Sequence, residues 1–322
     1  MIAFVAIALA AGAASALMFA SIISGELLSL VLFYLAPLPL MVAAIGWGPM
    51  SASIGGIAAA AGLGAFLGLP LCLSFVVAVA LPAWWLGHLI MLGRPAPGHA
   101  PDAAADSPAM EWYPLGRVLL WITGFATLTT FAALLTLGSD AASIASTLHQ
   151  GMSRILSAAD VSVSTDVDQW IDAMIRIAPA AAATFATLTL TLNLWLAAKI
   201  TASSGSLRRP WPDLKSTALP PMALAALFAA VGFCFAGGLI AILAIIVTST
   251  LLMAYALAGF AVLHTLTLTL RSRAFWLGSA YALIVMFVWP LLAMIALGLA
   301  DAAFGLRQRF WQRRQPPPLP AP

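Results

Sequence analysis

Charge is scarce in this chain. Only 8% of its 322 residues are Asp, Glu, Lys or Arg, whereas 63% are hydrophobic. The two cysteines, Cys72 and Cys234, both lie inside apolar runs, and neither has the spacing of a metal ligand. The four histidines are scattered along the sequence. We therefore predict no metal site, and we interpret both cysteines as buried, inert thiols.

Sequence motifs of common enzymes are absent. The chain lacks G-x-x-x-x-G-K-[ST], H-E-x-x-H and G-x-S-x-G, and its apolar runs hold no paired carboxylates for acid–base chemistry. No clear acidic group lies at membrane depth, where an energy-coupled pump would usually carry several. The formal net charge of +3 rests on few charges and is typical of basic membrane connections rather than of nucleic-acid binding. We therefore expect neither an enzyme nor a pump, with no cofactor and no nucleic-acid partner.

What the chain does have is apolar runs long enough to cross a bilayer. A membrane-spanning helix needs about 20 mainly apolar residues and satisfies its backbone hydrogen bonds internally. We predict an all-α fold, a polytopic transmembrane bundle of eight to nine spans over residues 1–300, followed by a basic, Pro-rich tail, 301–322. The expected apolar segments are 2–22, 27–46, 50–68, 69–92, 116–137, 175–198, 219–270 and 275–299. The first is interpreted as a span rather than a cleaved signal, because no Lys or Arg precedes it.

Two polar connections predict the orientation. The insertion 138–174 contains five Asp residues, and its apolar residues recur at helical spacing, which predicts two short amphipathic extramembrane helices. The connection 199–218 contains four basic residues. Because basic loops stay on the cytoplasmic side, we expect 199–218 in the cytoplasm and 138–174 on the opposite side.

The apolar stretch 219–270 leaves the span number open. Its 52 residues are too long for one crossing, which favours a hairpin broken at Gly237-Gly238 and nine spans in total. Nine spans would place the four Arg residues of the tail outside, whereas eight spans, with part of the stretch re-entrant, keep the tail in the cytoplasm. Charge favours the second alternative and length favours the first; we lean slightly towards the cytoplasmic tail.

Few polar side chains lie at membrane depth, and these are the candidate ligand-binding residues: Asn193, His264, Thr189 and His88. Asn193 and Thr189 share a helix face, whereas the sequence does not tell which faces meet in the bundle. Each of these side chains has a purely structural alternative, an interhelical hydrogen bond that tightens the bundle.

Small residues crowd the first span, where Ala6, Ala10 and Ala14 recur every four residues. Such faces let helix backbones approach closely in lipid. They predict either packing inside the bundle or a docking face for a partner membrane subunit.

Two phrases carry a family resemblance. The sequences PLPLMVAAIGWGP near 38–49 and LPAWWLGHLIMLGRP at 81–95 resemble the YybS-like family of multi-pass membrane proteins. That family is similar to the substrate-binding S components of energy-coupling factor transporters, in which small residues of the first span contact a transmembrane coupling subunit. The resemblance implies that role for the alanine ladder.

The functional prediction is an integral protein of the bacterial inner membrane, non-enzymatic, that serves as a small-solute-binding or transport-associated subunit. Its expected partners are the lipid bilayer, a membrane protein and a small molecule. The alternative is a non-transporting scaffold or assembly protein that recruits partners through its small-residue faces and its tail.

Overall fold

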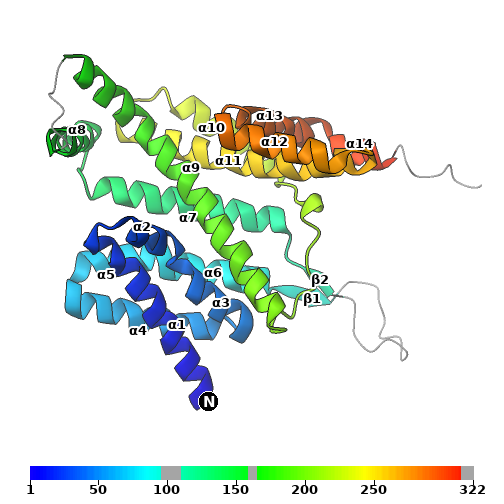
Figure 1. Ribbon diagram of the computed structural model, residues 1–322, viewed down its shortest axis with the longest axis horizontal. Coiled ribbons are helices and arrows are strands. Elements are labelled where there is room, and N and C mark those ends of the chain that lie inside the picture. Colours follow the sequence, from blue (N-terminus) through cyan, green and yellow to red (C-terminus); the bar gives the residue numbers. More distant parts are fainter. Residues whose placement is uncertain (96–109, 159–164, 313–322) are drawn as a thin grey trace, which may run out of the picture.

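A computed structural model describes residues 1–95, 110–158 and 165–312, and it confirms the all-α prediction (Figure 1). Within these residues the strands are β1 (Gly93–Pro95) and β2 (Met110–Trp112), a short antiparallel pair in which Gly93 lies opposite Trp112. All other elements are helical.

The first half of the bundle contains residues 2–90. Its elements are α1 (Ile2–Ala20), η1 (Ser21–Ser24), α2 (Leu27–Leu35), α3 (Pro37–Trp47), α4 (Pro49–Leu67), α5 (Leu69–Phe75), the π-helical turn η2 (Val76–Ala80) and α6 (Leu81–Ile90). The turns around α4 use glycines with positive φ: Gly48 at 96° and Gly68 at 94°. Each has a proline one or two residues later, in the first turn of the next helix, where a missing N–H costs nothing.

Three central helices follow, namely α7 (Leu115–Leu135), α8 (Ala141–Ala158) and α9 (Thr165–Ser203). α7 and α9 pack on each other and join the two halves of the bundle (Figure 1). α8 is the first amphipathic helix predicted in the 138–174 insertion. The second one is not separate: its residues form the first turns of α9, which is continuous for 39 residues. Residues 159–164 lie outside the described part.

The second half contains η3 (Leu214–Ser216), α10 (Pro221–Phe233), α11 (Gly238–Leu266), η4 (Thr267–Thr269), α12 (Arg273–Phe287), α13 (Leu291–Phe304) and α14 (Leu306–Gln312). The break predicted at Gly237-Gly238 is confirmed, with φ values of 81° and 60°. The single run predicted over 275–299 is wrong, because the chain turns back at 288–290 between α12 and α13. The predicted domain boundary at residue 300 falls inside α13, and α14 continues the bundle into the expected tail.

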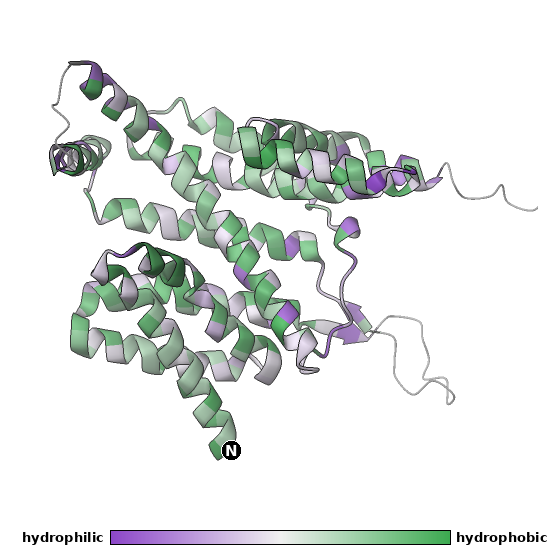
Figure 2. Cartoon of the chain, viewed as in Figure 1, coloured by the Kyte–Doolittle hydropathy of each residue, from purple (hydrophilic) through white to green (hydrophobic). Residues whose placement is uncertain are grey.

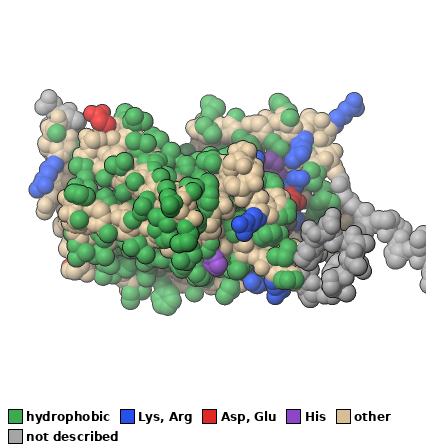
Figure 3. All heavy atoms as spheres, turned by 90° about the horizontal axis from the view of Figure 1, so that it is seen from below, with side chains coloured by type: hydrophobic (Ala, Val, Ile, Leu, Met, Phe, Trp, Pro, Cys, Tyr) green, Lys and Arg blue, Asp and Glu red, His purple; other side chains and the backbone are tan. Residues whose placement is uncertain are grey.

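Within the described residues, seven helical segments are long and apolar enough to cross a membrane; α13 and α14 meet the same criteria only when they are counted together across a 64° bend. α10 and α12 are apolar but have only 13 and 15 residues. Hydrophobic residues occupy the middle of the molecule (Figure 2), and on the face drawn in Figure 3 the charged side chains lie toward its two ends.

We call the end that holds 199–218 the basic face and the end that holds 138–158 the acidic face. Of the twelve described Lys and Arg residues, Arg154 and Arg176 belong to the acidic end, and the other ten, residues 94, 117, 199, 208, 209, 215, 271, 273, 307 and 309, belong to the basic end. The extra turn at 288–290 returns α14 to the basic face. The break at Gly237-Gly238 is thus present, and α14 lies at the same end of the molecule as 199–218; the side of the membrane stays a prediction. Arg313 and Arg314 lie outside the described residues.

Candidate functional site

A hollow with a partly polar lining lies at the basic face, between η3, α11, α13 and α14. We call it the basic pocket. Its volume is about 650 Å³, and it is lined by Lys215, Ala218, Leu219, Tyr255, Ala258, Gly298, Asp301, Ala302, Ala303, Phe304, Gly305, Arg307, Gln308 and Trp311. The size is in the range of small-molecule sites.

A buried ion pair closes one side of the basic pocket. Gly305, with φ 63°, turns the chain between α13 and α14 and brings Arg307 back onto Asp301. The Arg307 Nε and Nη2 donate to Asp301 Oδ2 at 2.9 and 2.6 Å, and its Nη1 donates to the carbonyl oxygens of Lys215 and Thr217 at 2.7 and 2.8 Å. The Arg307 side chain is 11% exposed. This clamp fixes the end of the chain to the connection before α10.

The charge balance of the basic pocket leaves one cation available. Asp301 neutralises Arg307, while no ion pair joins Lys215 to another described residue. Tyr255 is 1% exposed, and its hydroxyl finds no hydrogen-bond partner among the described residues. A buried polar atom of this kind is costly unless something satisfies it. The remaining walls, such as Leu219 and Phe304, are apolar.

Close helix packing forms the floor of the basic pocket. A Cβ on Gly259 of α11 would overlap the carbonyl oxygen of Met294, and one on Gly298 of α13 would overlap the carbonyl oxygen of Tyr255. Only glycine fits at such contacts, as in small-xxx-small packing of membrane helices. The glycines therefore hold the backbones of α11 and α13 together beside Tyr255.

The structure does not bring the predicted polar residues to one site. Asn193 is fully buried, and its Nδ2 donates to the carbonyl oxygens of Tyr34 and Thr189, each at 2.8 Å. Its Oδ1 has no partner among the described residues. His264 instead lies near α12, where its Nε2 is 2.8 Å from the Tyr281 hydroxyl. No contact in the described chain links Asn193 with His264.

His88 is half-buried at the basic end of α6, with its ring 6.0 Å from that of Trp85. It joins neither Asn193 nor His264 in the contacts of the described chain. The binding role of these residues stays a prediction. Their surroundings match the structural alternative of single interhelical hydrogen bonds for Asn193 and His264.

The alanine ladder faces away from the bundle. Ala6 and Ala10 are exposed and Ala14 is half-buried, whereas Ala8 and Gly12 are buried. A Cβ on Gly12 would overlap the carbonyl oxygen of Gly55 in α4. Internal packing of α1 therefore uses the neighbouring face, and the ladder is free to contact lipid or another helix.

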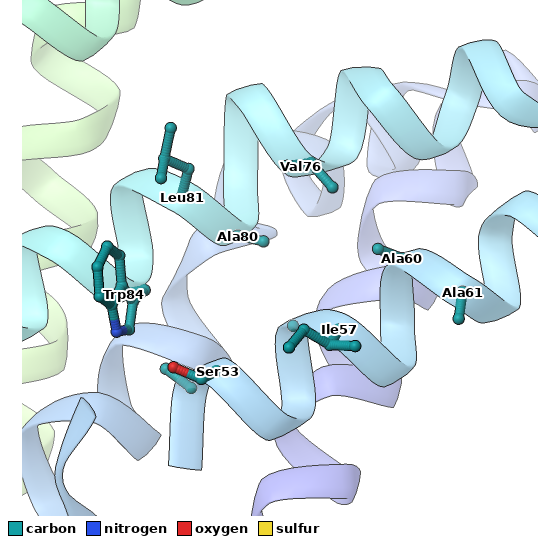
Figure 4. Close-up of a pocket in the computed structure, with 10 residues that line it drawn as sticks. Ser53, Ile57, Ala60, Ala61, Val76, Ala80, Leu81 and Trp84 are labelled. Atoms are coloured by element: carbon teal, nitrogen blue, oxygen red, sulfur yellow. The ribbon is translucent and has the colours of Figure 1, made fainter. Parts of the chain in front are cut away.

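A second hollow, of about 430 Å³, lies between α4 and the segment α5–η2–α6. Ile57 and Ala60 of α4 face Val76 and Ala80 across it, with Trp84 at one end (Figure 4). Nearly all of its lining is apolar, so it offers no set of polar groups that could orient a solute.

Another buried basic residue, Arg209, was not anticipated. It is 7% exposed, and its Nη1 donates to the carbonyl oxygen of Ile90 at 3.1 Å while its guanidinium lies 5.8 Å from the Trp112 ring. Burial lowers the pKa of Arg209 from its ordinary value. The residue ties the 199–218 connection to the end of α6 and to β2, so its role in the structure is to fasten the basic face.

The ion pair of the basic pocket has a local signal in the sequence that was not used. Asp301 and Arg307 flank a glycine at a spacing that closes an ion pair once the chain turns, yet both were assigned to a tail. Within the described residues, no group of three or more His, Cys, Asp or Glu side chains could hold a metal ion.

Residues 13–302 match the model of a family described as predicted membrane protein (DUF2232). The chain belongs to this family. No curated protein and no solved structure gives a significant match. The DUF2232 match begins within α1 and ends within α13, so it covers the bundle, including Tyr255, Gly298 and Asp301 of the basic pocket.

Proposed function

We propose that this multi-pass membrane protein binds a small amphipathic anion in the basic pocket. The observation that carries the proposal is the combination of one uncompensated cation, Lys215, with the unpartnered buried hydroxyl of Tyr255 inside a mainly apolar hollow. A carboxylate or phosphate group accepts hydrogen bonds from both donors, and an apolar remainder fits against Leu219 and Phe304.

In this proposal the protein is a non-enzymatic, solute-binding or transport-associated subunit of the bacterial inner membrane, with its basic face in the cytoplasm. Ten of the twelve described Lys and Arg residues lie at that face, which supports the orientation. The resemblance to the YybS-like family and to S components supports the class of function. The alternative is a scaffold, and the outward position of Ala6 and Ala10 favours it.

The test is mass spectrometry of small molecules retained by the purified protein, followed by titration with octanoate and octyl phosphate as probes. Lys215→Gln and Tyr255→Phe should each reduce retention and weaken probe binding. Lys199→Gln is the matched control, since Lys199 lies on the same face but contacts the Trp211 ring, 4.2 Å away, outside the basic pocket. Equal retention by all three variants and the natural chain contradicts the proposal, and a protein without any retained molecule or probe binding favours the scaffold.

A further inference from the structure

The hairpin formed by α12 and α13 is too short to cross a bilayer. At 1.5 Å per residue, its helices of 15 and 14 residues are about 22 and 21 Å long, against a hydrocarbon core of about 30 Å. Both open ends of the hairpin lie at the basic face, next to Arg273 and Arg307.

The register of α13 on α11 gives the depth of the turn. Gly259 contacts Met294 and Gly298, and Gly298 contacts Tyr255 and Gly259. Because α11 and α13 both end at the basic face, the two helices run parallel, with an offset of 39 residues (294 − 255 and 298 − 259). With the same offset, Trp289 in the turn is level with Thr250 (289 − 39). The turn is therefore twelve residues, or about 18 Å, from the start of α11 at Gly238.

A full-length neighbour places that level in the middle of the membrane. The Thr250 hydroxyl is 3.1 Å from that of Thr127, and Thr127 is the thirteenth of the 21 residues of α7. α7 passes the length and hydropathy required of a span. The turn between α12 and α13 thus lies near the middle of a helix that crosses the bilayer.

The backbone of this turn is built for an apolar solvent. The N–H groups of Val288, Trp289 and Leu291 donate to the carbonyl oxygens of Ile284, Phe287 and Val288, and Pro290 has no N–H. Val288 adopts a φ of 55° in the tight turn that makes this possible. Unsatisfied N–H groups in hydrocarbon cost several kcal/mol each, so this internal bonding removes the main obstacle to a turn in lipid.

The side chains of the turn match the same surroundings. Val285, Met286, Val288 and Trp289 are between 66% and 81% exposed. No charged residue occurs between Arg273 and Asp301. Water would make such an exposed apolar tip unfavourable, whereas acyl chains solvate it.

We propose that α12 and α13 form a re-entrant hairpin that enters from the basic face, with the 285–289 turn in contact with lipid acyl chains near the middle of the bilayer. The inference does not depend on the ligand of the basic pocket. The 285–289 turn is surrounded by the hydrocarbon of the membrane, rather than by water or a protein partner.

Spin labels test the depth directly. Single cysteines at Val288 and, in a second variant, Val285 are labelled with a nitroxide in a Cys72→Ala/Cys234→Ala background and reconstituted in phosphatidylcholine vesicles. Collision with oxygen, which concentrates in the membrane interior, is compared with collision with a water-soluble nickel complex. Ser204 is the control, because it is exposed in the polar 199–218 connection at the basic face.

Both hairpin labels should collide strongly with oxygen and weakly with nickel, whereas the Ser204 label should be accessible to nickel. Nickel accessibility at Val288 and Val285 equal to that at Ser204 means that the turn emerges into water and overturns the proposal. Low accessibility to both reagents means that protein covers the tip, and this also overturns it.

Discussion

Two pairs of parallel helices, one in each half of the molecule, are held by the same device but sit in different surroundings. α1 packs on α4 through Gly12 and Gly55, and α11 packs on α13 through Gly259 and Gly298. In the first half, the chain that links the pair includes the buried residues Leu40 and Met41 of α3. In the second half, the link is α12, in which no residue is buried.

The difference shows that a glycine contact holds two helices together but does not determine the length or the position of the segment that connects them. The first link, α2 with α3, is 21 residues long and passes the criteria for a span, so it can return through the core of the bundle. The 15-residue α12 cannot, and it lies at the periphery, where the stacked rings of Phe260 and Tyr281, 5.4 Å apart, attach it to α11. The first half is therefore expected to be rigid, and the second half to depend on local fastenings.

The largest effect on stability is expected from breaking the Asp301–Arg307 ion pair at the basic pocket. Arg307→Met leaves Asp301 buried without its partner, which should cost about 3–5 kcal/mol of stability. Because Glu26 is the only charged residue before Arg94, the first half has no equivalent bond and should keep its protection. Hydrogen exchange measured by mass spectrometry should show faster exchange in α13 and α14 and unchanged exchange in α3 and α4.

The double variant Asp301→Leu/Arg307→Met is the control, because it removes both charges and should recover most of the loss. Equally faster hydrogen exchange in both halves of the single variant would contradict the claim that the two halves respond independently.

The second-largest loss of stability is expected when the glycines at the helix contacts are replaced by alanine. Gly12→Ala and Gly259→Ala both force a Cβ into a neighbouring backbone, and overpacking costs about 1–3 kcal/mol. We expect the loss of stability near the upper end for Gly12, whose partner α4 also packs on α3 and α6, and near the lower end for Gly259, since the peripheral α12–α13 hairpin can shift. Thermal unfolding in detergent measures both.

Gly62→Ala and Gly278→Ala are the matched controls in the two halves, since neither added Cβ would meet another atom within 4 Å. A larger loss of stability in Gly259→Ala than in Gly12→Ala would contradict the expected difference between the two halves.

A smaller effect is expected where α9 meets the first half. Asn193→Leu removes the bond to the Tyr34 carbonyl, and interhelical hydrogen bonds in membranes contribute about 1 kcal/mol. Thr191→Val is the control, because the Thr191 hydroxyl donates to Thr187 of its own helix. If the basic pocket binds the solute, Asn193→Leu should still retain it. Loss of solute retention in this variant would indicate that the solute binds at Asn193 instead.

The smallest effect concerns the acidic face. Backbone N–H groups of Ser143 and Ala142 donate to Asp140, and these bonds, led by that from Ser143, hold the pKa of Asp140 below its ordinary value. The ionised carboxylate is thus favoured in the folded state, so its contribution is present above the unfolded pKa near about 4 and is lost as the pH falls below it. Hydrogen exchange at the start of α8, divided by the intrinsic exchange rate at each pH, should increase when the pH is lowered from 6 to 3, and the increase should be absent in Asp140→Asn. An equal pH response in both proteins would exclude this capping role.

Features that depend only on neighbouring residues could be predicted from the sequence, whereas features that depend on tertiary contacts could not. Gly237-Gly238 was readable as a break because only glycine readily adopts positive φ. The turn at Val288 was not, because a β-branched residue at φ 55° is set by tertiary context and follows no local rule. Asn193 was recognised as an interior polar group, but its partner Tyr34 lies 159 residues away. The ion pair of Arg307 with Asp301, six residues away, was missed for another reason: it forms only after Gly305 turns the chain.

The central claim is that residues 273–304 form a hairpin that returns the chain to the basic face. Single cysteines at Ser143, Ser204 and Gln312, in the Cys72→Ala/Cys234→Ala background, are labelled on intact spheroplasts with a membrane-impermeant maleimide and again after lysis. We predict that Ser143 labels on intact spheroplasts, and that Ser204 and Gln312 label only after lysis. Labelling of Gln312 together with Ser143 would mean that 273–304 crosses once, and it would contradict the account.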